Sequence, residues 1–293
     1  MPNADVPQYH RFAWDGFSFE VPVDWELSHH QTHSGFAQIE MEDDVARRLE
    51  MEWTRMQASM TSDKINRRYE KLAGEVRVLG GEASPVTEPP PGWSACLYSM
   101  PDGRRLLTAF FQASAGLHCL FKFHFERASY REPLRVFRRL AETFKVMLHG
   151  PVIWEFLDVA FQLNPECRMT GISLQAGSKL MEFDWRWRRL FLWVFSPADV
   201  ILRQTKSPDE WCAKILNKYK DIRGAVFRPG PRPGELVWRR EWRYIFGRFE
   251  DLYRRCNRYR AVWQVVEQKN QLLLTVYHYR TESDLSTIGL QWL

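Results

Sequence analysis

Alternation of apolar and polar residues marks the first clear element of the chain. Residues 17–22 read Phe-Ser-Phe-Glu-Val-Pro, and a period of two is typical of a strand with one buried face. The alternation returns around 36–56, at 159–164 and around 178–203. We therefore expect a strand and then a further strand or hairpin in each half of the chain.

Helical spacing follows each of these strand regions. Apolar residues from Ile65 to Val76 recur at intervals of three and four, which predicts a helix. In the second half, Ser207 followed by Pro and Glu is a helix start signal, and an apolar stripe runs from Trp211 to Val226. The order of strand, hairpin and helix is thus the same in both halves.

A nearly constant shift aligns the two halves residue by residue. It places residues 17–22 on 159–164, and Tyr69 of the first predicted helix on Tyr219 of the second. The same comparison matches four alternating positions: Arg47, Leu49, Met51 and Trp53 with Arg189, Phe191, Trp193 and Phe195. Closing strands around Phe123-His124-Phe125 and Tyr277-His278-Tyr279 also correspond. This pattern predicts a tandem duplication.

The two copies differ at their ends. A helix is predicted over about 130–148, opened by Pro133, whereas the last ten residues leave room for only a shortened helix. We therefore predict an α+β fold of two tandem copies, residues 1–149 and 150–293, each a twisted antiparallel sheet flanked by helices. Because a sheet face without its helix is unfavourable in water, we expect the copies to pack about a pseudo-twofold.

Bulk composition is that of an ordinary globular protein. The chain has 293 residues, of which 45% are hydrophobic and 26% charged. Its five cysteines are odd in number, widely spaced and without a CxxC pair, which favours a reducing compartment over disulfide or zinc chemistry. No apolar run is long enough to span a membrane, and no signal-like segment opens the chain. We expect a cytoplasmic protein.

Charge divides unevenly between the halves. Residues 1–150 hold 18 Lys+Arg and 20 Asp+Glu, whereas residues 151–293 hold 23 and 16. The basic half contains two runs in which Arg alternates with aromatic residues, at 185–189 and 238–248. Such runs can stack bases and hold phosphates, but in a strand they also place rings in a core and charges outside. The candidate binding residues are Trp185, Trp187, Arg239, Arg240, Trp242, Arg243, Arg258 and Arg260.

Residues 17–27 resemble the opening of PsbP-like and DcrB-like domains. They read Phe-Ser-Phe-Glu-Val-Pro-Val-Asp-Trp-Glu-Leu, an apolar strand followed by Pro22, two residues and Trp25. The second copy departs from this form, because Cys167 stands where the Trp would be. The resemblance implies a sheet flanked by helices and a non-catalytic role as an assembly factor or adaptor. One branch of DcrB-like domains comprises type VI secretion chaperones, which work as dimers and hold apolar helices of effector proteins.

Candidate catalytic and metal-binding groups are few. His29, His30 and His33 cluster in a predicted loop, while Glu40 and Glu42, like Glu50 and Glu52, share a strand face. His124 and His278 hold equivalent places in the two halves and are expected to be sheet-face residues. None of the common catalytic motifs is present. We therefore assign no catalytic residue, metal ligand or cofactor.

Three functions remain open. The first is a non-enzymatic adaptor or chaperone-like protein that holds a polypeptide on a sheet surface or in a groove between the repeats. The second is a basic protein that binds nucleic acid or another anionic ligand. The third is an enzyme or metal protein that uses the carboxylates of the first half or His29–His33. We favour the first, with a polypeptide as partner, and make no prediction of the oligomeric state.

Overall fold

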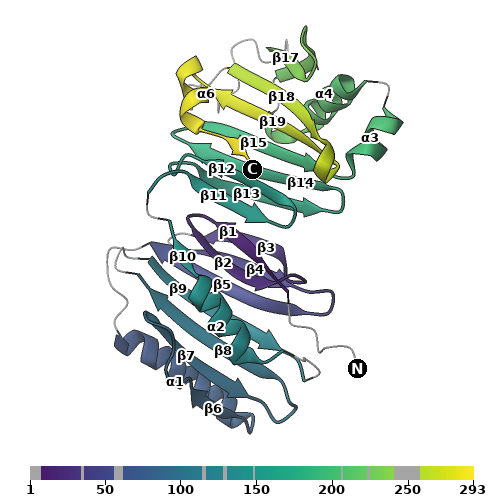
Figure 1. Cartoon of the computed structure of the whole chain (residues 1–293). Helices are drawn as coiled ribbons and strands as arrows, with labels where there is room; N and C mark the ends of the chain where they lie inside the picture. The colour runs from purple at the N-terminus through teal and green to yellow at the C-terminus, as the bar shows by residue number, and fades with distance from the viewer. Residues whose placement is uncertain are drawn as a thin grey trace. The chain divides into compact units, whose positions relative to one another are not determined.

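The chain forms two compact units. The computed structural model describes residues 8–33, 36–55, 62–113, 117–127, 131–147, 149–205, 207–222, 225–240 and 258–293. Contacts divide the chain into unit 1, Met1–Leu148 with Trp154–Leu157, and unit 2, His149–Ile153 with Asp158–Leu293 (Figure 1).

Strands dominate both units. They account for 53% of the described residues and form three antiparallel sheets, whereas the helices are few and mostly short. The predicted α+β fold, two helix-flanked copies packed about a pseudo-twofold, was therefore wrong, because the chain is mostly β. One reason is visible in the sequence: the helix expected to reach Val226 ends at Lys218, and Val226 lies in a strand beside Pro229.

Unit 1 is built on a seven-stranded sheet in the order β3-β4-β5-β9-β8-β7-β6. Helix α1 (Ser62–Val78) packs on one face, where Val76 joins a core cluster with Tyr98. Helix α2 (Pro133–Thr143) packs on the other face, where Phe137 contacts Phe123. The strands of this sheet are β3 (Glu26–His33), β4 (Phe36–Glu42), β5 (Arg47–Arg55), β6 (Glu82–Pro85), β7 (Trp93–Ser99), β8 (Arg105–Gln112) and β9 (Leu117–Phe125).

Shorter strands lie against this sheet on the α2 side. Strand β2 (Phe17–Pro22) pairs with β1 (Tyr9–Trp14) and β10 (Lys145–Val146), and β1 pairs with β11 (Val152–Phe156). The β1–β2 turn is tight because Asp15 and Gly16 both take positive φ, as two-residue hairpins require. Phe17 meets Trp53 of the large sheet edge to face, at 5.1 Å between ring centres, so aromatic packing joins the layers.

Unit 2 repeats the strand order, β13-β14-β15-β19-β18-β17-β16. The strands of this sheet are β13 (Arg168–Gln175), β14 (Ser178–Trp185), β15 (Arg188–Phe195), β16 (Ala225–Pro229), β17 (Glu235–Arg240), β18 (Arg258–Val266) and β19 (Gln271–Tyr279). Strand β12 (Val159–Leu163) pairs with β20 (Gln291–Trp292) in another sheet. The helices of unit 2 are α3 (Ala198–Gln204), α4 (Pro208–Lys218) and α6 (Glu282–Ile288), with 3₁₀ turns η1 (Lys220–Ile222) and η3 (Glu267–Lys269). The predicted start of α4 is confirmed, since the Ser207 hydroxyl accepts a hydrogen bond from the Glu210 amide.

Helix α3 interrupts a region predicted to be strand. Residues 178–203 were expected to form a strand or hairpin, but β15 ends at Phe195 and α3 follows. Ala198 is buried in the core of unit 2, and Ile201 and Leu202 pack against it. The corresponding residues of unit 1, 56–61 between β5 and α1, lie outside the part of the chain that the structure describes.

Register identifies the residues that share the face covered by α1. Glu50 pairs with Lys122, Lys122 with Thr108, and Thr108 with Cys96. Cys96 lies in the core cluster beneath α1. Because directly paired residues project from the same side of a sheet, all four belong to the α1 face of unit 1.

Strand register also shows which residue of unit 2 corresponds to Glu50. Phe191 pairs with Val276, which pairs with Ala261, and all three lie in the core packed against α4. Phe191 thus occupies the place of Glu50 on the helix-bearing face, not that of Leu49. The predicted match of Leu49 with Phe191 was wrong by one residue, and a one-residue slip exchanges the two faces of a strand.

Candidate functional site

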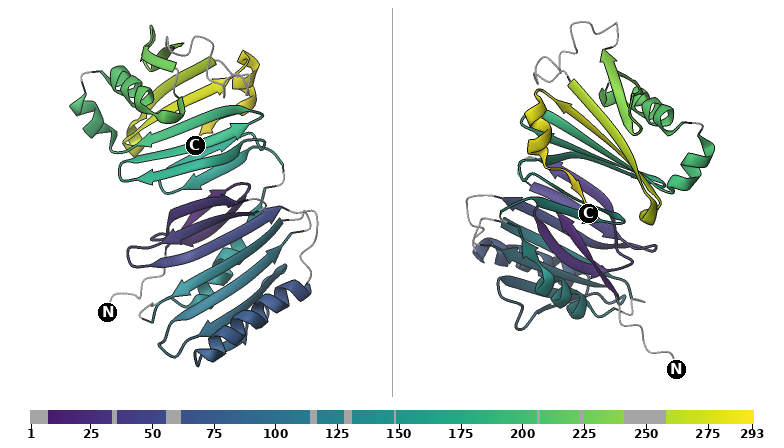
Figure 2. Two further views of the ribbon diagram at one scale, coloured as in Figure 1. Left: turned by 180° about the vertical axis from the view of Figure 1, so that it is seen from behind. Right: turned by 45° about the horizontal axis from the view of Figure 1, so that its top comes forward.

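Helix α1 covers the α1 face only in part. Its contacts are with β6 and β7, and Figure 2 shows it lying beside that end of the sheet. The Tyr69 hydroxyl donates to the Ser94 carbonyl at 2.7 Å, and its ring meets Phe110 edge to face at 5.4 Å. Beyond Phe110, toward β9, β5 and β4, no helix of the described chain packs on this face.

A network of charged side chains occupies the open part. Its members are Glu40, Arg47, Glu50, Glu52, Lys122 and His124, and we call them the Glu50 cluster. Glu50 is central: its carboxylate lies 3.0 Å from Lys122 Nζ, 2.9 Å from His124 Nε2 and 3.2 Å from Arg47 Nη1. Its side chain is only 12% exposed, so the network shields it although none of the described helices lies above it.

The other two carboxylates of the cluster, Glu40 and Glu52, pair with different cations. Glu40 lies 3.0 Å from Arg47 Nε and accepts a hydrogen bond from the Gln38 amide. Glu52 lies 3.3 Å from Lys122 Nζ, and its side chain is 29% exposed. Glu52 is therefore the more accessible of the carboxylates that share Lys122.

Hydrogen bonding favours the charged forms of Glu50 and Lys122. The hydrogen bond from His124, with a further one from Lys122, holds the pKa of Glu50 well below its usual range despite partial burial. Burial alone would lower the pKa of Lys122, but Glu50 and Glu52 outweigh it and raise that pKa. The pairing moves the pKa values of Glu50 and Lys122 away from neutrality, whereas efficient proton transfer near pH 7 needs a pKa close to that value.

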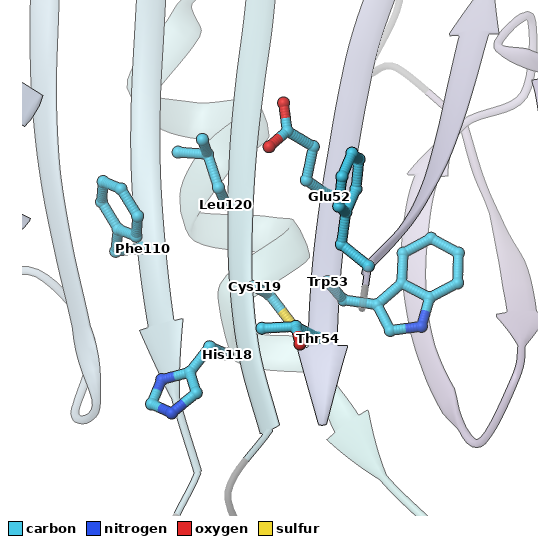
Figure 3. Close-up of a pocket in the computed structure, with 8 residues that line it drawn as sticks. Glu52, Trp53, Thr54, Phe110, His118, Cys119 and Leu120 are labelled. Atoms are coloured by element: carbon cyan, nitrogen blue, oxygen red, sulfur yellow. The ribbon is translucent and has the colours of Figure 1, made fainter. Parts of the chain in front are cut away.

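A pocket of about 230 Å³ adjoins the cluster at Glu52. Figure 3 shows Phe110, Leu120 and Glu52 side by side on β8, β9 and β5, with His118 and Thr54 along the same strands. Phe36 of β4 completes the lining. Trp53 and Cys119 also border it, but as the intervening residues they project to the opposite face. The result is an apolar hollow with one carboxylate at its edge.

The corresponding positions of unit 2 are filled. Glu52 pairs with Leu120 across β5 and β9, and Trp193 pairs with Leu274 across the equivalent strands β15 and β19. By register, Glu52 therefore corresponds to Trp193, and Leu120 to Leu274. Trp193 and Leu274 are buried in the core to which Ile201 of α3 adds. The pocket of unit 1 therefore lies where unit 2 has the large side chain of Trp193, whose ring centre lies 5.2 Å from that of Tyr219.

A second hollow lies at the other end of β9 on the same face. It has a volume of about 320 Å³ and is bordered by His124 and Leu106, with Leu79 just past α1 and Arg104 and Arg105 beside it. The Glu50 cluster thus runs between two hollows, the first apolar with a carboxylate and the second bordered by guanidinium groups. Such a surface can bind an elongated partner by combining apolar contacts with charges.

The residues described offer little for metal binding or nucleophilic catalysis. Within them, no group of three His, Cys, Asp or Glu side chains is arranged to hold a metal ion. Cys96, Cys119, Cys167 and Cys212 are buried, and burial raises the pKa of Cys167 and Cys212 to about 12. A thiol with so high a pKa is a poor nucleophile.

The His run does not form the predicted loop. Residues 29–33 lie in β3, where His30 turns inward and its ring centre lies 5.3 Å from that of Trp14. Burial lowers the pKa of His30 to about 4, so the imidazole is neutral in the fold. His29 lies near Gln31 on the other face of the strand, and the strand separates these imidazoles.

The first Arg-aromatic run lies at the β14–β15 turn. Trp185 is buried and donates to Glu166 at 2.7 Å, whereas Trp187 is 57% exposed in the turn itself. Each of the neighbouring guanidinium groups contacts a carboxylate: Arg186 with Glu166, Arg188 with Asp284 and Arg189 with Asp184. These internal ion pairs compete with phosphate for the same cations.

The second run is spread over β17 and β18. Arg239, Arg258 and Arg260 are exposed, and register places them on the sheet face opposite α4. Arg240 is half-buried on the α4 side with Trp238. Trp242 and Arg243 lie outside the described residues.

Sequence reasoning missed the pocket of unit 1. The two Glu pairs and His124 were noticed separately, but nothing local joins β5 to β9, which are far apart in the chain and paired in the fold. The alternation of Glu50, Glu52 and Thr54 with apolar residues was the available signal, because unit 2 has apolar residues on both faces of the matching strand.

Comparisons with known proteins place the chain only distantly. No family model matches it, and neither does any curated protein. Among solved structures it is similar to cyanobacterial PsbP (CyanoP) from Synechocystis sp. PCC 6803, at 14% identity and a TM-score of 0.35. That similarity covers 50% of this chain and 96% of the other. The PsbP-like part of the predicted resemblance thus has a distant counterpart, whereas the duplication and the DcrB-like branch stay predictions.

Among the described helices, none combines the length and the apolar character needed to cross a membrane.

Proposed function

We propose that this chain is a non-enzymatic binding protein of the adaptor or chaperone-like type, and that the α1 face of unit 1 holds a polypeptide partner. One observation carries the proposal. The helix-bearing face is filled by apolar side chains and α3 in unit 2, but in unit 1 it presents a pocket and a charged cluster.

The pocket beside Glu52 suits a side chain of a polypeptide better than a whole small molecule. Pockets for whole small ligands have volumes of roughly 300–1,000 Å³ and bury most of the ligand. The hollow beside Glu52 is smaller, at about 230 Å³, and a row of ion pairs continues from it along β9 to the second hollow. Apolar anchor positions within a polar surround are typical of protein interfaces.

Two further predictions from the sequence, a tandem duplication and a DcrB-like chaperone role in the cytoplasm, extend this proposal. The common strand order of the two large sheets supports a tandem duplication, after which unit 1 retained an open face and unit 2 closed its own. A role like that of the DcrB-like chaperones, in the cytoplasm, is consistent with a partner-binding face. Both belong to the proposal and await their own tests.

The test compares what the intact protein retains when the pocket is filled. Tagged wild-type protein and the variant Thr54→Phe are purified from native cells, with Thr170→Phe, on an exposed position of β13, as the matched control. We expect a stoichiometric polypeptide on the wild type and the control, and its loss from Thr54→Phe. Equal retention by all three would contradict the assignment of the site.

A nuclease-treated sample tests the second candidate function, which is binding of nucleic acid or another anionic ligand. The exposed Arg239, Arg258 and Arg260 on one face of unit 2 are the observation that favours an anionic ligand. Recovery of nucleic acid that falls steeply with salt, together with no polypeptide, would favour that function over the one proposed.

A further inference from the structure

We infer that the pocket beside Glu52 in unit 1 receives a single Arg side chain of the partner polypeptide, with its methylene groups on the apolar lining and its guanidinium on the Glu52 carboxylate. This inference rests on the proposed function and names the residue of the partner that the pocket binds. It follows from the lining of the pocket, from the pairing of Glu52 and from the way in which this chain holds its own Arg side chains.

The pocket has the size and the lining for one long side chain. Its volume is about 230 Å³, and the buried side chains of Phe110 and Leu120 form its apolar floor. Phe36, which is 42% exposed, and Glu52 stand at its border. An Arg side chain matches this combination, because its methylene groups pack on apolar surface while its guanidinium stays at a polar rim.

Glu52 has an oxygen atom available for such a cation. Its Oε1 accepts a hydrogen bond from Lys122 Nζ at 3.3 Å, and none of the described residues donates to its Oε2. Glu50 contacts both permanent cations of the Glu50 cluster, Lys122 and Arg47, whereas Glu52 shares Lys122 only. Because three carboxylates share two permanent cations, a negative charge remains at the pocket, and a cation on the partner complements it.

This chain repeatedly holds its own Arg side chains between an aromatic ring and a carboxylate. The guanidinium of Arg188, for example, lies 5.2 Å from the centre of the Trp185 ring and 2.9 Å from Asp284. Within the described part of the chain, every cation over an aromatic ring belongs to an Arg that also pairs with a carboxylate: Arg131, Arg139, Arg186, Arg188 and Arg189. No described Lys has such surroundings, which favours Arg over Lys as the occupant.

The spacing across the pocket fits the same arrangement. Glu52 pairs with Leu120 and Leu120 with Phe110, so the carboxylate and the ring stand two strand spacings apart, about 10 Å at the backbone (Figure 3). In unit 2, the guanidinium of Arg189 lies 5.9 Å from the centre of a Phe ring and 3.5 Å from a carboxylate. A guanidinium placed over Leu120 therefore meets the ring on one side and Glu52 on the other at distances of this order.

The test uses the full-length protein and synthetic pentapeptides, Ac-Ala-Ala-X-Ala-Ala-amide, in which X is Arg, citrulline, Lys or Trp. Trp is included because an indole N–H of this chain also donates to a carboxylate, as Trp53 does to Asp15. Saturation-transfer difference NMR measures the affinity and shows which protons of each peptide contact the protein. We expect saturation chiefly on the Arg methylene protons, and at least about tenfold weaker binding of the citrulline peptide, equivalent to about 1.4 kcal/mol.

Citrulline has the shape of Arg without its charge, so equal binding of these two peptides would overturn the inference. The Lys and Trp peptides should also bind more weakly than the Arg peptide. If either of them binds as tightly, the pocket does not select Arg and the inference is wrong.

Variants of Glu52 separate charge from folding. Glu52→Gln should weaken binding of the Arg peptide at least about tenfold, and unchanged binding would contradict the inference. Glu42→Gln, on an exposed position of β4 outside both hollows, is the matched control and should leave the affinity unchanged. Glu52→Lys should bind a peptide with Glu at X better than the Arg peptide. Such a reversal cannot arise from misfolding, which weakens both peptides.

The outcomes distinguish the inference from the proposed function. If a natural polypeptide is lost from Thr54→Phe but the Arg peptide binds no better than the citrulline peptide, the proposed function stands and this inference fails. If the Arg peptide is preferred but no polypeptide is retained from native cells, the chemistry of the pocket stands and the proposed function fails. Free L-arginine that binds as tightly as the Arg peptide would assign the pocket to a small guanidinium compound. A dimer of the free protein that Thr54→Phe dissociates would assign it to a second copy. Either of these last two results overturns the inference.

Discussion

The Glu50 carboxylate lies 2.9 Å from Nε2 of His124, in a pair that joins β5 to β9 on the α1 face of unit 1. The same carboxylate also holds Lys122 at 3.0 Å. One acidic side chain, 12% exposed, thus fixes two partners: His124 borders the second hollow, and Lys122 also pairs with Glu52 at the edge of the pocket. Replacing Glu50 therefore measures how much the cluster contributes to the free energy of unfolding.

Replacing Glu50 by Gln should lower the free energy of unfolding at pH 7 by about 1–3 kcal/mol, because hydrogen bonds to charged groups are lost and Lys122 keeps only Glu52. Urea denaturation measures the change. Glu75→Gln is the control: its pair with Lys71 spans 4.0 Å between exposed side chains, and we expect a loss below about 0.5 kcal/mol. Equal effects of the two substitutions would show that the cluster adds no stability.

Acid should remove the contribution of Glu50. The pKa of Glu50 is lowered in the folded protein from an ordinary 4.5, so its stabilisation is complete above pH 4.5 and is lost as pH falls through the folded value. The difference in stability between wild type and Glu50→Gln should therefore narrow as pH falls below 4.5. A difference that stays constant from pH 7 to 3 would contradict this account.

Protonation of His30 should destabilise the fold at mildly acidic pH. Burial lowers its pKa from 6.5 to about 4, so the unfolded chain binds more protons between these values and stability falls as pH decreases through that range. We expect His30→Phe, which keeps an aromatic ring against Trp14, to reduce the loss between pH 7.5 and 5 by about 2 kcal/mol. Denaturation curves at both pH values provide the measurement, and parallel losses in the two proteins would refute it.

Two glycines near α1 should respond in opposite directions to substitution by Ala. A Cβ at Gly74 would meet nothing within 4 Å, so Gly74→Ala should stabilise the helix by about 0.5–1 kcal/mol. A Cβ at Gly81 would lie 2.5 Å from the Ser99 carbonyl oxygen and 2.7 Å from Val76, so Gly81→Ala should cost about 1–3 kcal/mol. Thermal unfolding of the two variants measures both signs, and the prediction fails if Gly81→Ala is tolerated.

Helix α3 should stabilise unit 2 through its inward side chains. Leu202→Ala removes a partly buried side chain that packs on the core and should cost about 1–2 kcal/mol. Val200, which is 41% exposed on the same helix, is the matched control, and Val200→Ala should change stability by less than about 0.5 kcal/mol. If both variants unfold like the wild type, α3 does not cover this core.

The strands were largely predictable because their pattern is local. The alternation at 17–22 and around 36–56 corresponds to β2 and to the β4–β5 hairpin, since each strand exposes one side to a core. The start of α4 was equally local, because a cap needs only Ser207 and the residues that follow it. The end of α4 could not be predicted locally, because Val226 fits the apolar spacing of a helix as well as that of a strand. Its pairing with β17 in the fold makes it part of a strand.

The site depended on contacts that no local pattern contains. Glu50 and Lys122 meet because β5 pairs with β9, and Glu52 borders a pocket because Phe110 and Leu120 lie on the next two strands. The match of Leu49 with Phe191 failed for a related reason, because sequence alternation does not say which face bears the helix. The sequence by itself determined where most strands form and that their order recurs. Only the tertiary structure decided which face of each sheet was covered, because cover depends on pairing and packing between segments distant in the chain.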